Sequence, residues 1–187
     1  MRKLFYVVFA VLVVLSSSCE QEEEQFSSDP SAQLRFSADS VSFDTLFTTV
    51  GSVTKRLWVY NDYDNALNIK RISLRNAASS FQLLVNGEKG TDFNNVTLLG
   101  KDSLQLLLSL EVDPRNQNLP FLITDYIDFN TNGNEQDVTL VGWGQDAIFI
   151  DKQILDCATT WTPGRPYVLL DTVFVAEGCQ LILQAGT

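Results

Sequence analysis

The sequence predicts an all-β protein whose main part is an immunoglobulin-like antiparallel β-sandwich. First, apolar and polar residues alternate with a period of two from Leu34 onward, which is typical of half-buried strands. Second, short segments rich in Gly, Pro, Asn and Asp separate these runs and indicate turns. Third, no helical stripe follows Ser18. About seven short strands at this spacing favour a sandwich of immunoglobulin type.

Segment 1–18 has the features of a lipoprotein export signal. Arg2 and Lys3 supply positive charge, Leu4 to Leu15 form an unbroken apolar run, and Ser16 to Ser18 are small residues before a cleavage point. The run is too short to cross about 30 Å of hydrocarbon, which takes about 20 helical residues. We therefore expect a removable signal helix and neither a membrane span nor a buried core helix.

The stretch VLSSSC places Cys19 directly behind these small residues. It resembles a lipobox, the signal for attaching diacylglycerol to the first mature cysteine of a bacterial lipoprotein. It departs from the usual pattern because Leu15 lies four residues before Cys19 rather than three. The alternative is that Cys19 forms a disulfide, but a cysteine followed by a cluster of glutamates does not pack into a core. Two or more acyl chains anchor a protein stably, and we expect Cys19 to be the anchor.

Segment 19–33 is acidic and then rich in Ser, Pro and Gln, which is the composition of a disordered tether. The acidic cluster resembles the export tag of Bacteroidetes-type surface lipoproteins, and a plain spacer is the alternative. The formal net charge of the chain is −10. Such a charge repels nucleic acid, so no nucleic-acid partner is expected, and solubility is its simplest role.

The strands of segment 34–147 are predicted from alternation. In SLQLLLSLEV, the core-facing residues are Leu104, Leu106, Leu108, Leu110 and Val112. The other predicted strands cover residues 40–47, 53–60, 67–74, 81–85, 123–129 and 138–143. In LNIKRISL the apolar phase slips, which predicts a bulge near Lys70 and Arg71. Asn132-Gly133 between two alternating runs predicts a tight hairpin.

Parts of this segment resemble a known family. SFDTLFTTVGS near its start and VGWGQDA at its end are similar to the N-terminal immunoglobulin-like module of a family of Bacteroidetes-type surface lipoproteins. The first stretch, with LWVYN and LNI, is also similar in pattern to Hydin-like and ASPM-like β-sandwich modules. The resemblance implies a fold and a location at the cell surface. It carries no agreed chemistry.

Segment 148–187 has a different pattern, with three short apolar strands at 167–170, 173–175 and 181–183. It resembles the opening coil of a right-handed parallel β-helix, which follows the sandwich in that family. A coil with a period of about 20 residues buries its face only against a neighbouring coil. We therefore expect an incomplete first coil, in the front part of a longer protein or in a truncated reading frame.

The β-helix resemblance gives Cys157 and Cys179 a role, because their spacing of about one coil places them on successive turns. In an oxidising compartment they are expected to form a disulfide. Two buried free cysteines are the alternative. Two thiols without histidine do not complete a tetrahedral zinc site, so no metal is expected.

Catalytic residue sets are absent from the sequence. The chain has no histidine, which excludes Ser–His–Asp and Cys–His arrangements, and it has no GxxxxGK[ST] phosphate loop. Asp62 and Asp64 fit a solvated turn better than a glycosidase pair. DFNTNG at 128–133 resembles half of a calcium loop, but Thr139 replaces the closing Glu, so a hairpin is expected. We expect no catalytic residue and no cofactor in this chain.

Two kinds of surface site are predicted. Triplets of Asp, Ser or Thr, and an apolar residue resemble the O-glycosylation sites of Bacteroidetes-type secreted proteins, and ordinary turn structure is the alternative. Their hydroxyl residues are Ser40, Thr45, Ser103 and Thr172. The aromatic residues Trp58, Tyr60 and Tyr63 are candidates for stacking on a sugar, and cross-strand pairing is the alternative.

Together these features predict a non-catalytic lipoprotein module, anchored in the outer membrane and displayed at the cell surface, for display or binding of a glycan or protein partner. A periplasmic location is the alternative. One other function is the N-terminal part of a β-helix polysaccharide lyase or hydrolase whose catalytic residues lie beyond Thr187. Another is a structural component of the envelope.

Overall fold

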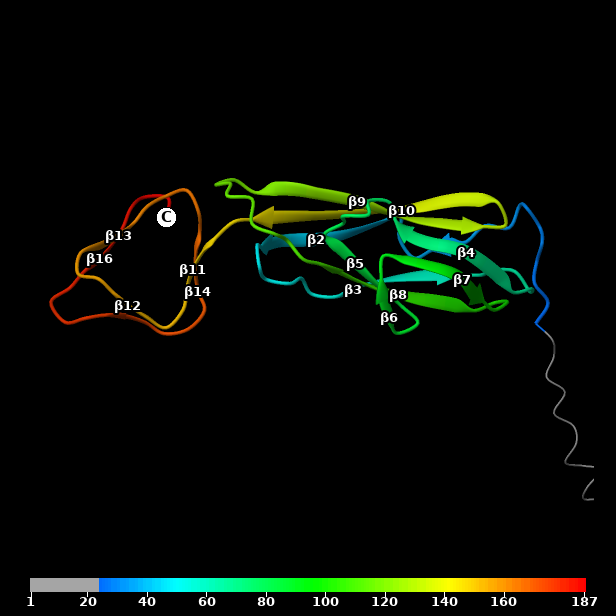
Figure 1. The fold of residues 1–187 in the computed structure, drawn as a ribbon, viewed down its shortest axis with the longest axis horizontal. Helices are drawn as coiled ribbons and strands as arrows, with labels where there is room; N and C mark the ends of the chain where they lie inside the picture. Colours follow the sequence, from blue (N-terminus) through cyan, green and yellow to red (C-terminus); the bar gives the residue numbers. More distant parts are fainter. Residues whose placement is uncertain (1–23) are drawn as a thin grey trace, which may run out of the picture.

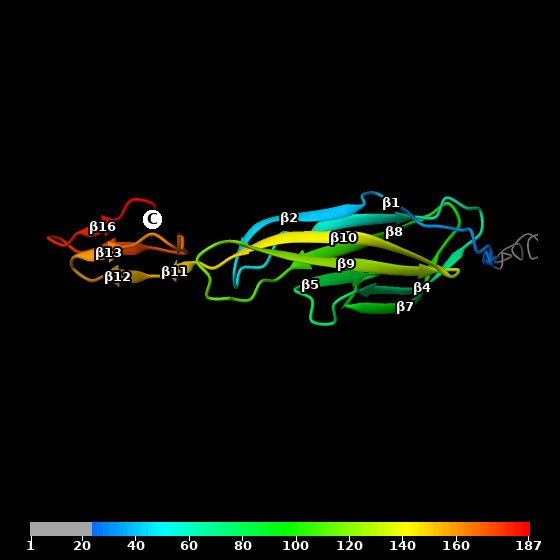
Figure 2. The same cartoon turned by 90° about the horizontal axis from the view of Figure 1, so that it is seen from above.

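The computed structural model of the chain describes residues 24–187. The expected signal segment 1–18 and the expected anchor Cys19 lie outside these residues. The described residues form strands and turns without a helix, so the all-β prediction is confirmed for them. Accordingly, this part of the chain has no helix long and apolar enough to cross a membrane. Figures 1 and 2 show a two-layer sandwich with a ring-shaped C-terminal segment beyond one end.

Each layer of the sandwich is a five-stranded sheet. The first sheet has the order β1 (Arg35–Phe36), β3 (Lys55–Tyr60), β8 (Ser103–Leu110), β5 (Phe81–Val85) and β6 (Glu88–Gly90). The second has the order β2 (Ser40–Phe47), β10 (Asn134–Gln145), β9 (Phe121–Thr131), β4 (Leu67–Leu74) and β7 (Asp92–Leu98). In chain order, β1, β3, β5 and β8 correspond to strands A, B, D and E, and β4, β9 and β10 to C, F and G. The sandwich is therefore immunoglobulin-like, as predicted.

The prediction of an antiparallel sandwich is wrong at one strand pair. β2 runs parallel to β10, from Ser40 beside Thr139 to Phe47 beside Gln145. The chain begins in the first sheet with β1 and then crosses to the second, where β2 enters alongside the last strand in the same direction. Side-chain alternation is the same for both directions, so the sequence pattern does not distinguish them.

Strands β6 and β7 are not predicted by the alternation. β7 reads DFNNVTL, and only Phe93 and Leu98 are buried in it. Asn95 in its centre has a φ of 56°, in the left-handed region, which interrupts the regular pattern. β7 is therefore held by pairing with β4 rather than by its own apolar face.

The hydrophobic core lies between the two sheets. Leu104, Leu106, Leu108 and Leu110 of β8 are buried, as the alternation predicts. Phe43 of β2 and Phe81 of β5 connect the two sheets, with ring centroids 5.6 Å apart. Each fully buried side chain of this kind contributes about 1.5–3 kcal/mol.

Two local predictions are confirmed. The pairing of β4 with β9 shifts register between Ile69 and Arg71, which is the predicted bulge. Asn132 and Gly133 have φ values of 51° and 88° and connect β9 to β10. Positive φ at both residues is the geometry of a type I′ hairpin turn.

Residues 25–33 differ from the expected tether, because they lie against the sandwich. Ser27 N–H donates to Ala66 O at 2.8 Å, and Ala66 N–H donates to Gln25 O at 2.9 Å. The side-chain amide of Asn134 donates to Ala32 O at 2.9 Å, and Ala32 is fully buried. The local composition predicts that water solvates this segment. Instead, amide side chains from distant strands donate hydrogen bonds to its backbone oxygens.

The C-terminal segment contains three parallel strand pairs. β11 (Ile148–Ile150) pairs with β14 (Tyr167–Leu169), β12 (Gln153–Leu155) with β15 (Val173–Val175), and β13 (Thr159–Trp161) with β16 (Leu181–Leu183). The chain thus makes two successive turns of three strands each. Leu155 is buried, and the ring of Trp161 stacks on Tyr167 with centroids 4.4 Å apart. Several apolar side chains stay exposed, namely Ile154, Leu169, Leu170, Phe174 and Leu183.

Candidate functional site

Two of the three candidate stacking aromatics lie on one face of the molecule. Trp58 and Tyr60 face outward from β3 because Val59 between them faces the core. Trp58 exposes 36% of its surface. Tyr63 lies in the following turn, where its hydroxyl accepts a hydrogen bond from Gln33 N–H at 3.2 Å. The structure therefore brings Trp58 and Tyr60 together and leaves Tyr63 apart.

The ring of Tyr60 is covered by Arg35 of β1. The guanidinium carbon of Arg35 lies 4.1 Å from the ring centroid, and its Nε donates to a carboxylate oxygen of Asp62 at 2.6 Å. This hydrogen bond holds the pKa of Asp62 below its ordinary value. Solvent screens the exposed pair, so it contributes little stability. Of the two aromatic residues on β3, Trp58 therefore keeps a ring that is available for stacking on a ligand.

The neighbours of Trp58 on this face are polar. Gln105 of β8 is its cross-strand partner, in the pairing that the sequence left as the alternative to a ligand site. On the other side, Trp58 N–H donates to Ser37 Oγ at 3.0 Å, and Ser37 N–H donates to Trp58 O at 2.9 Å. The backbone of Trp58 is thus held by Ser37, and the polar side chain of Gln105 lies beside its ring on the neighbouring strand.

A charged cluster on the outer face of the second sheet is not predicted from the sequence. Arg75, just after β4, donates to Asp128 of β9 at 2.5 Å and to Asp137 of β10 at 2.7 Å. Its guanidinium carbon lies 4.0 Å from the ring centroid of Tyr126. Hydrogen bonds to Asp128 and then Asp137 raise the pKa of Arg75 above its ordinary value. The groove beside it has a volume of about 510 Å³.

One signal in the sequence points to this cluster. A two-residue turn at Asn132-Gly133 fixes the register of β9 and β10, which places Asp128 opposite Asp137. Like charges directly opposite each other are destabilising unless a cation joins them. Since Arg75 donates hydrogen bonds to both carboxylates, we interpret the cluster as a tie between strands rather than as a vacant ligand site.

Asp146 is a buried carboxylate where the sandwich meets the C-terminal segment. Its oxygens accept hydrogen bonds from Gln117 N–H at 2.7 Å and Arg115 N–H at 3.2 Å. Burial acts to raise its pKa, but the hydrogen bonds from Gln117, Arg115 and Thr48 outweigh it and hold the pKa below its ordinary value. Arg165 of the C-terminal segment adds an attraction in the same direction. Asp146 therefore ties a surface loop to the junction.

Replacing Asp146 by Asn should lower the free energy of unfolding by about 1–2 kcal/mol at pH 7, because a carboxylate acceptor becomes in part a donor facing N–H groups. The folded pKa lies below the unfolded value of about 3.9. The stabilisation is therefore present above pH 4 and is lost as the pH falls through the folded pKa. Urea unfolding at pH 7 and pH 2.5 measures the difference, with exposed Asp113→Asn as control. An equal difference at both pH values would contradict this role.

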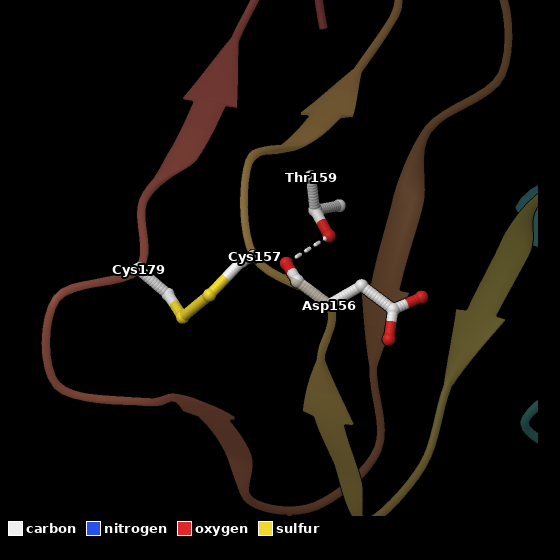
Figure 3. The surroundings of a disulfide bond; sticks show 4 residues. All are labelled: Asp156, Cys157, Thr159 and Cys179. Atoms are coloured by element: carbon white, nitrogen blue, oxygen red, sulfur yellow. Dashed lines mark hydrogen bonds between the residues drawn. A yellow bond between two sulfur atoms is a disulfide. The ribbon is translucent and has the colours of Figure 1, made fainter.

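Cys157 and Cys179, the pair named from the sequence, form a disulfide in the structure, with Cα atoms 4.6 Å apart (Figure 3). Cys157 follows β12 and Cys179 precedes β16, so the bond connects the two turns of the C-terminal segment. Next to it, Thr159 Oγ1 donates to Asp156 O at 2.6 Å. A disulfide across a loop of this size contributes about 3 kcal/mol. Since this segment buries little apolar surface, the bond is a major part of its stability.

The candidate glycosylation residues are all accessible to some degree. Ser40, Thr45 and Thr172 are exposed, and Ser103 is half-buried. The carboxylates that precede Ser103 and Thr172 accept hydrogen bonds from the backbone N–H groups of these two residues at 2.7 and 2.6 Å. This is the turn structure that the sequence offers as the alternative. Modification at any of the four residues stays a prediction.

Metal-binding groups are not found in the described part of the chain. Among residues 24–187, no three Cys, Asp or Glu side chains lie where they could hold a metal ion. Segment 128–133, which resembles half of a calcium loop, consists of the end of β9 and its hairpin turn.

These features define an immunoglobulin-like β-sandwich protein with a disulfide-linked C-terminal segment. No protein-family model and no curated protein matches the chain. It is similar to a solved structure of a protein of unknown function from Porphyromonas gingivalis W83, with 17% identity and a TM-score of 0.45. The similarity covers 66% of this chain and 59% of that one.

Two other solved structures are similar to the chain. For PapD-like domain 7 of human CEP192, the identity is 13% and the TM-score 0.41, over 70% of this chain and 97% of that one. For the Escherichia coli chaperone DraB, the identity is 12% and the TM-score 0.39, over 62% and 55%. The fold class given above follows from the strand order of this chain itself.

Proposed function

We propose that the chain is a lipid-anchored module of the bacterial cell surface, held through Cys19, which displays or binds a glycan or protein partner without catalysis of its own. The sequence features of segment 1–19 support the anchor. The outward-facing Trp58, in its polar environment, supports a binding role. The observation that carries the proposal is that the N-terminal residues 25–33 and the C-terminal segment lie at opposite ends of the sandwich (Figure 1).

Residues 25–33 and the hairpin of β9 and β10 lie at one end of the sandwich, and the C-terminal segment lies beyond the other end (Figure 1). Gln25, where the packed segment begins, is six residues after Cys19, and six residues span at most about 22 Å. An anchor at Cys19 would therefore hold the hairpin end close to the membrane. The C-terminal segment would then project outward, as display requires.

We further infer that the three parallel strand pairs are the first two coils of a parallel β-helix, where the sequence pattern predicts a single incomplete coil. Parallel pairing of strands from successive turns is the arrangement of that solenoid, in which each coil covers the next. The exposed apolar side chains of the second turn, such as Leu169 and Phe174, fit a surface on which a further coil packs. The sandwich would then act as a spacer that carries this segment away from the membrane.

The test is an intact-mass measurement on the membrane fraction of Bacteroidetes cells that express the chain, combined with protease treatment of whole cells. We expect a lipid mass increment that Cys19→Ala abolishes, and cleavage by external protease. Cys157→Ala removes a different cysteine, one that is bound in the disulfide, and should keep the lipid. An unlipidated soluble product would contradict the anchor, and lipidated protein that resists protease only until the cells are lysed would contradict surface display.

A further inference from the structure

The outer face of the first sheet carries a row of side chains that crosses four strands. Lys89 of β6 is the cross-strand partner of Leu84 of β5, Leu84 is the partner of Leu107 of β8, and Leu107 is the partner of Arg56 of β3. Residues directly opposite each other in a ladder share a face. The row therefore has a cation at each end and two leucines between them. Three strand spacings of about 4.8 Å separate its ends by about 14 Å.

Shallow depressions that contain some polar side chains lie on both sides of the leucine pair. One, of about 230 Å³, is lined by Gln82 and Ser109 beside Leu84 and Leu107. The other, of about 280 Å³, is lined by Asn86, Ser103 and Gln105 beside the same leucines. Trp58 stands opposite Gln105 in the next strand. The face thus combines an apolar centre, one exposed indole ring, and side-chain amides and hydroxyls that can donate and accept hydrogen bonds.

The two cations of the row are free of ion pairs within residues 24–187. Arg56 and Lys89 are exposed, and neither forms a salt bridge there, whereas Arg35, Arg71, Arg75, Lys101 and Lys152 all do. The chain as a whole has a formal net charge of −10. Unpaired cations on one face of an acidic protein make that face complementary to an anionic ligand. The rest of the surface repels such a ligand, so this face is where it is repelled least.

We propose that this face binds an acidic polysaccharide, a chain of sugars with carboxylate groups. Carboxylates would pair with Arg56 and Lys89, a sugar ring would stack on Trp58, and hydroxyl groups would bond to Gln105 and Gln82. The proposal rests on the proposed binding function and names its ligand class. A protein partner fits less well, because a stable protein interface has an apolar core and buries about 800 Å² on each partner. Here the leucines are half-buried and polar groups surround them.

The experiment is isothermal titration of the purified full chain with polygalacturonate, alginate and hyaluronate at low and high salt. Methyl-esterified polygalacturonate keeps the sugar backbone but lacks the charge, and polyglutamate keeps the charge but lacks the sugar. We expect at least one acidic polysaccharide to bind about tenfold or more tightly than both controls, and to weaken at high salt.

Variants locate the site. We expect Arg56→Gln combined with Lys89→Gln, and separately Trp58→Ala, to weaken binding about tenfold. Lys70→Gln, which removes an exposed cation of the second sheet that forms no ion pair in the described residues, should stay within about twofold of wild type. Thermal unfolding verifies that each variant is folded. A Trp58→Phe variant that retains part of the affinity supports stacking if Trp58→Ala is unstable.

The results of these binding experiments test the ligand assignment independently of lipidation at Cys19. Absence of binding to all three acidic polysaccharides, or binding that the variants leave unchanged, overturns the ligand assignment even if Cys19 is lipidated and the chain is exposed on cells. Equal binding of polyglutamate also overturns it and favours an acidic protein partner. Specific binding by a chain that carries no lipid supports the ligand assignment and contradicts only the proposed anchor.

Discussion

Replacing Asn61 by Asp should lower the free energy of unfolding by at least about 3 kcal/mol at pH 7. Asn61 is buried, and its Nδ2 donates to the backbone oxygens of Asn65 at 2.9 Å, Leu98 at 3.1 Å and Leu99 at 2.9 Å. Its Oδ1 accepts a hydrogen bond from Tyr63 N–H at 3.0 Å. An aspartate would place a charged oxygen against three carbonyl oxygens and remove the donor that Nδ2 supplies to them.

Equilibrium urea unfolding of the full chain measures this effect. Asn65→Asp is the matched control, because it makes the same change in the same turn at an exposed side chain. We expect that control to remain within about 0.5 kcal/mol of wild type. Protonation of the new carboxyl would restore one donor, so the effect of Asn61→Asp should decrease at acid pH. Equal effects of the two variants would show that the side chain of Asn61 does not hold the turn.

Replacing Gly100 by Ala should destabilise the sandwich by about 3 kcal/mol. A Cβ atom at this position would lie 1.8 Å from the backbone oxygen of Asp64 and 2.5 Å from its carbonyl carbon. These are backbone atoms, so relief requires the two turns to move apart. That movement would strain the hydrogen bond from Lys101 N–H to Tyr63 O, which is 2.9 Å long. The turn after β3 and the turn before β8 therefore require glycine at their contact.

Gly51→Ala is the control for this substitution, because a Cβ there has no atom within 4 Å and its φ is not in the left-handed region. We expect it to be neutral or slightly stabilising, since alanine restricts the unfolded chain. Differential scanning calorimetry of both variants provides the comparison. A melting temperature for Gly100→Ala within a degree of wild type would mean that the turns separate without cost.

Both substitutions act at the end of the sandwich that receives the N-terminal segment. Asn65, which Asn61 holds through its backbone oxygen, directly precedes Ala66, and Ala66 exchanges hydrogen bonds with Gln25 and Ser27. If Cys19 is the anchor, this end lies next to the membrane. Loosening the turns would then also release residues 25–33, and proteolysis between Gln25 and Gln33 should increase together with the loss of stability.

Most strands of the sandwich follow from the sequence because burial on one face imposes a period of two on the residues themselves. The ranges 40–47, 67–74 and 81–85 agree with β2, β4 and β5 at both ends. Asn132-Gly133 fixes its hairpin for an equally local reason, since both residues tolerate positive φ. For the candidate site, the same period places Trp58 and Tyr60 on one face of β3.

Only the tertiary structure decided which strands are neighbours, because a local sequence pattern does not specify the order of strands in a sheet. Alternation states which side of a strand is buried, but it does not state what lies beside that strand or in which direction the neighbour runs. The parallel pairing of β2 with β10, the packing of residues 25–33, and the ties through Arg75 and Asp146 all depend on contacts between distant segments. The row from Lys89 to Arg56 is of the same kind, because its four residues are brought together only by the order of strands in the sheet.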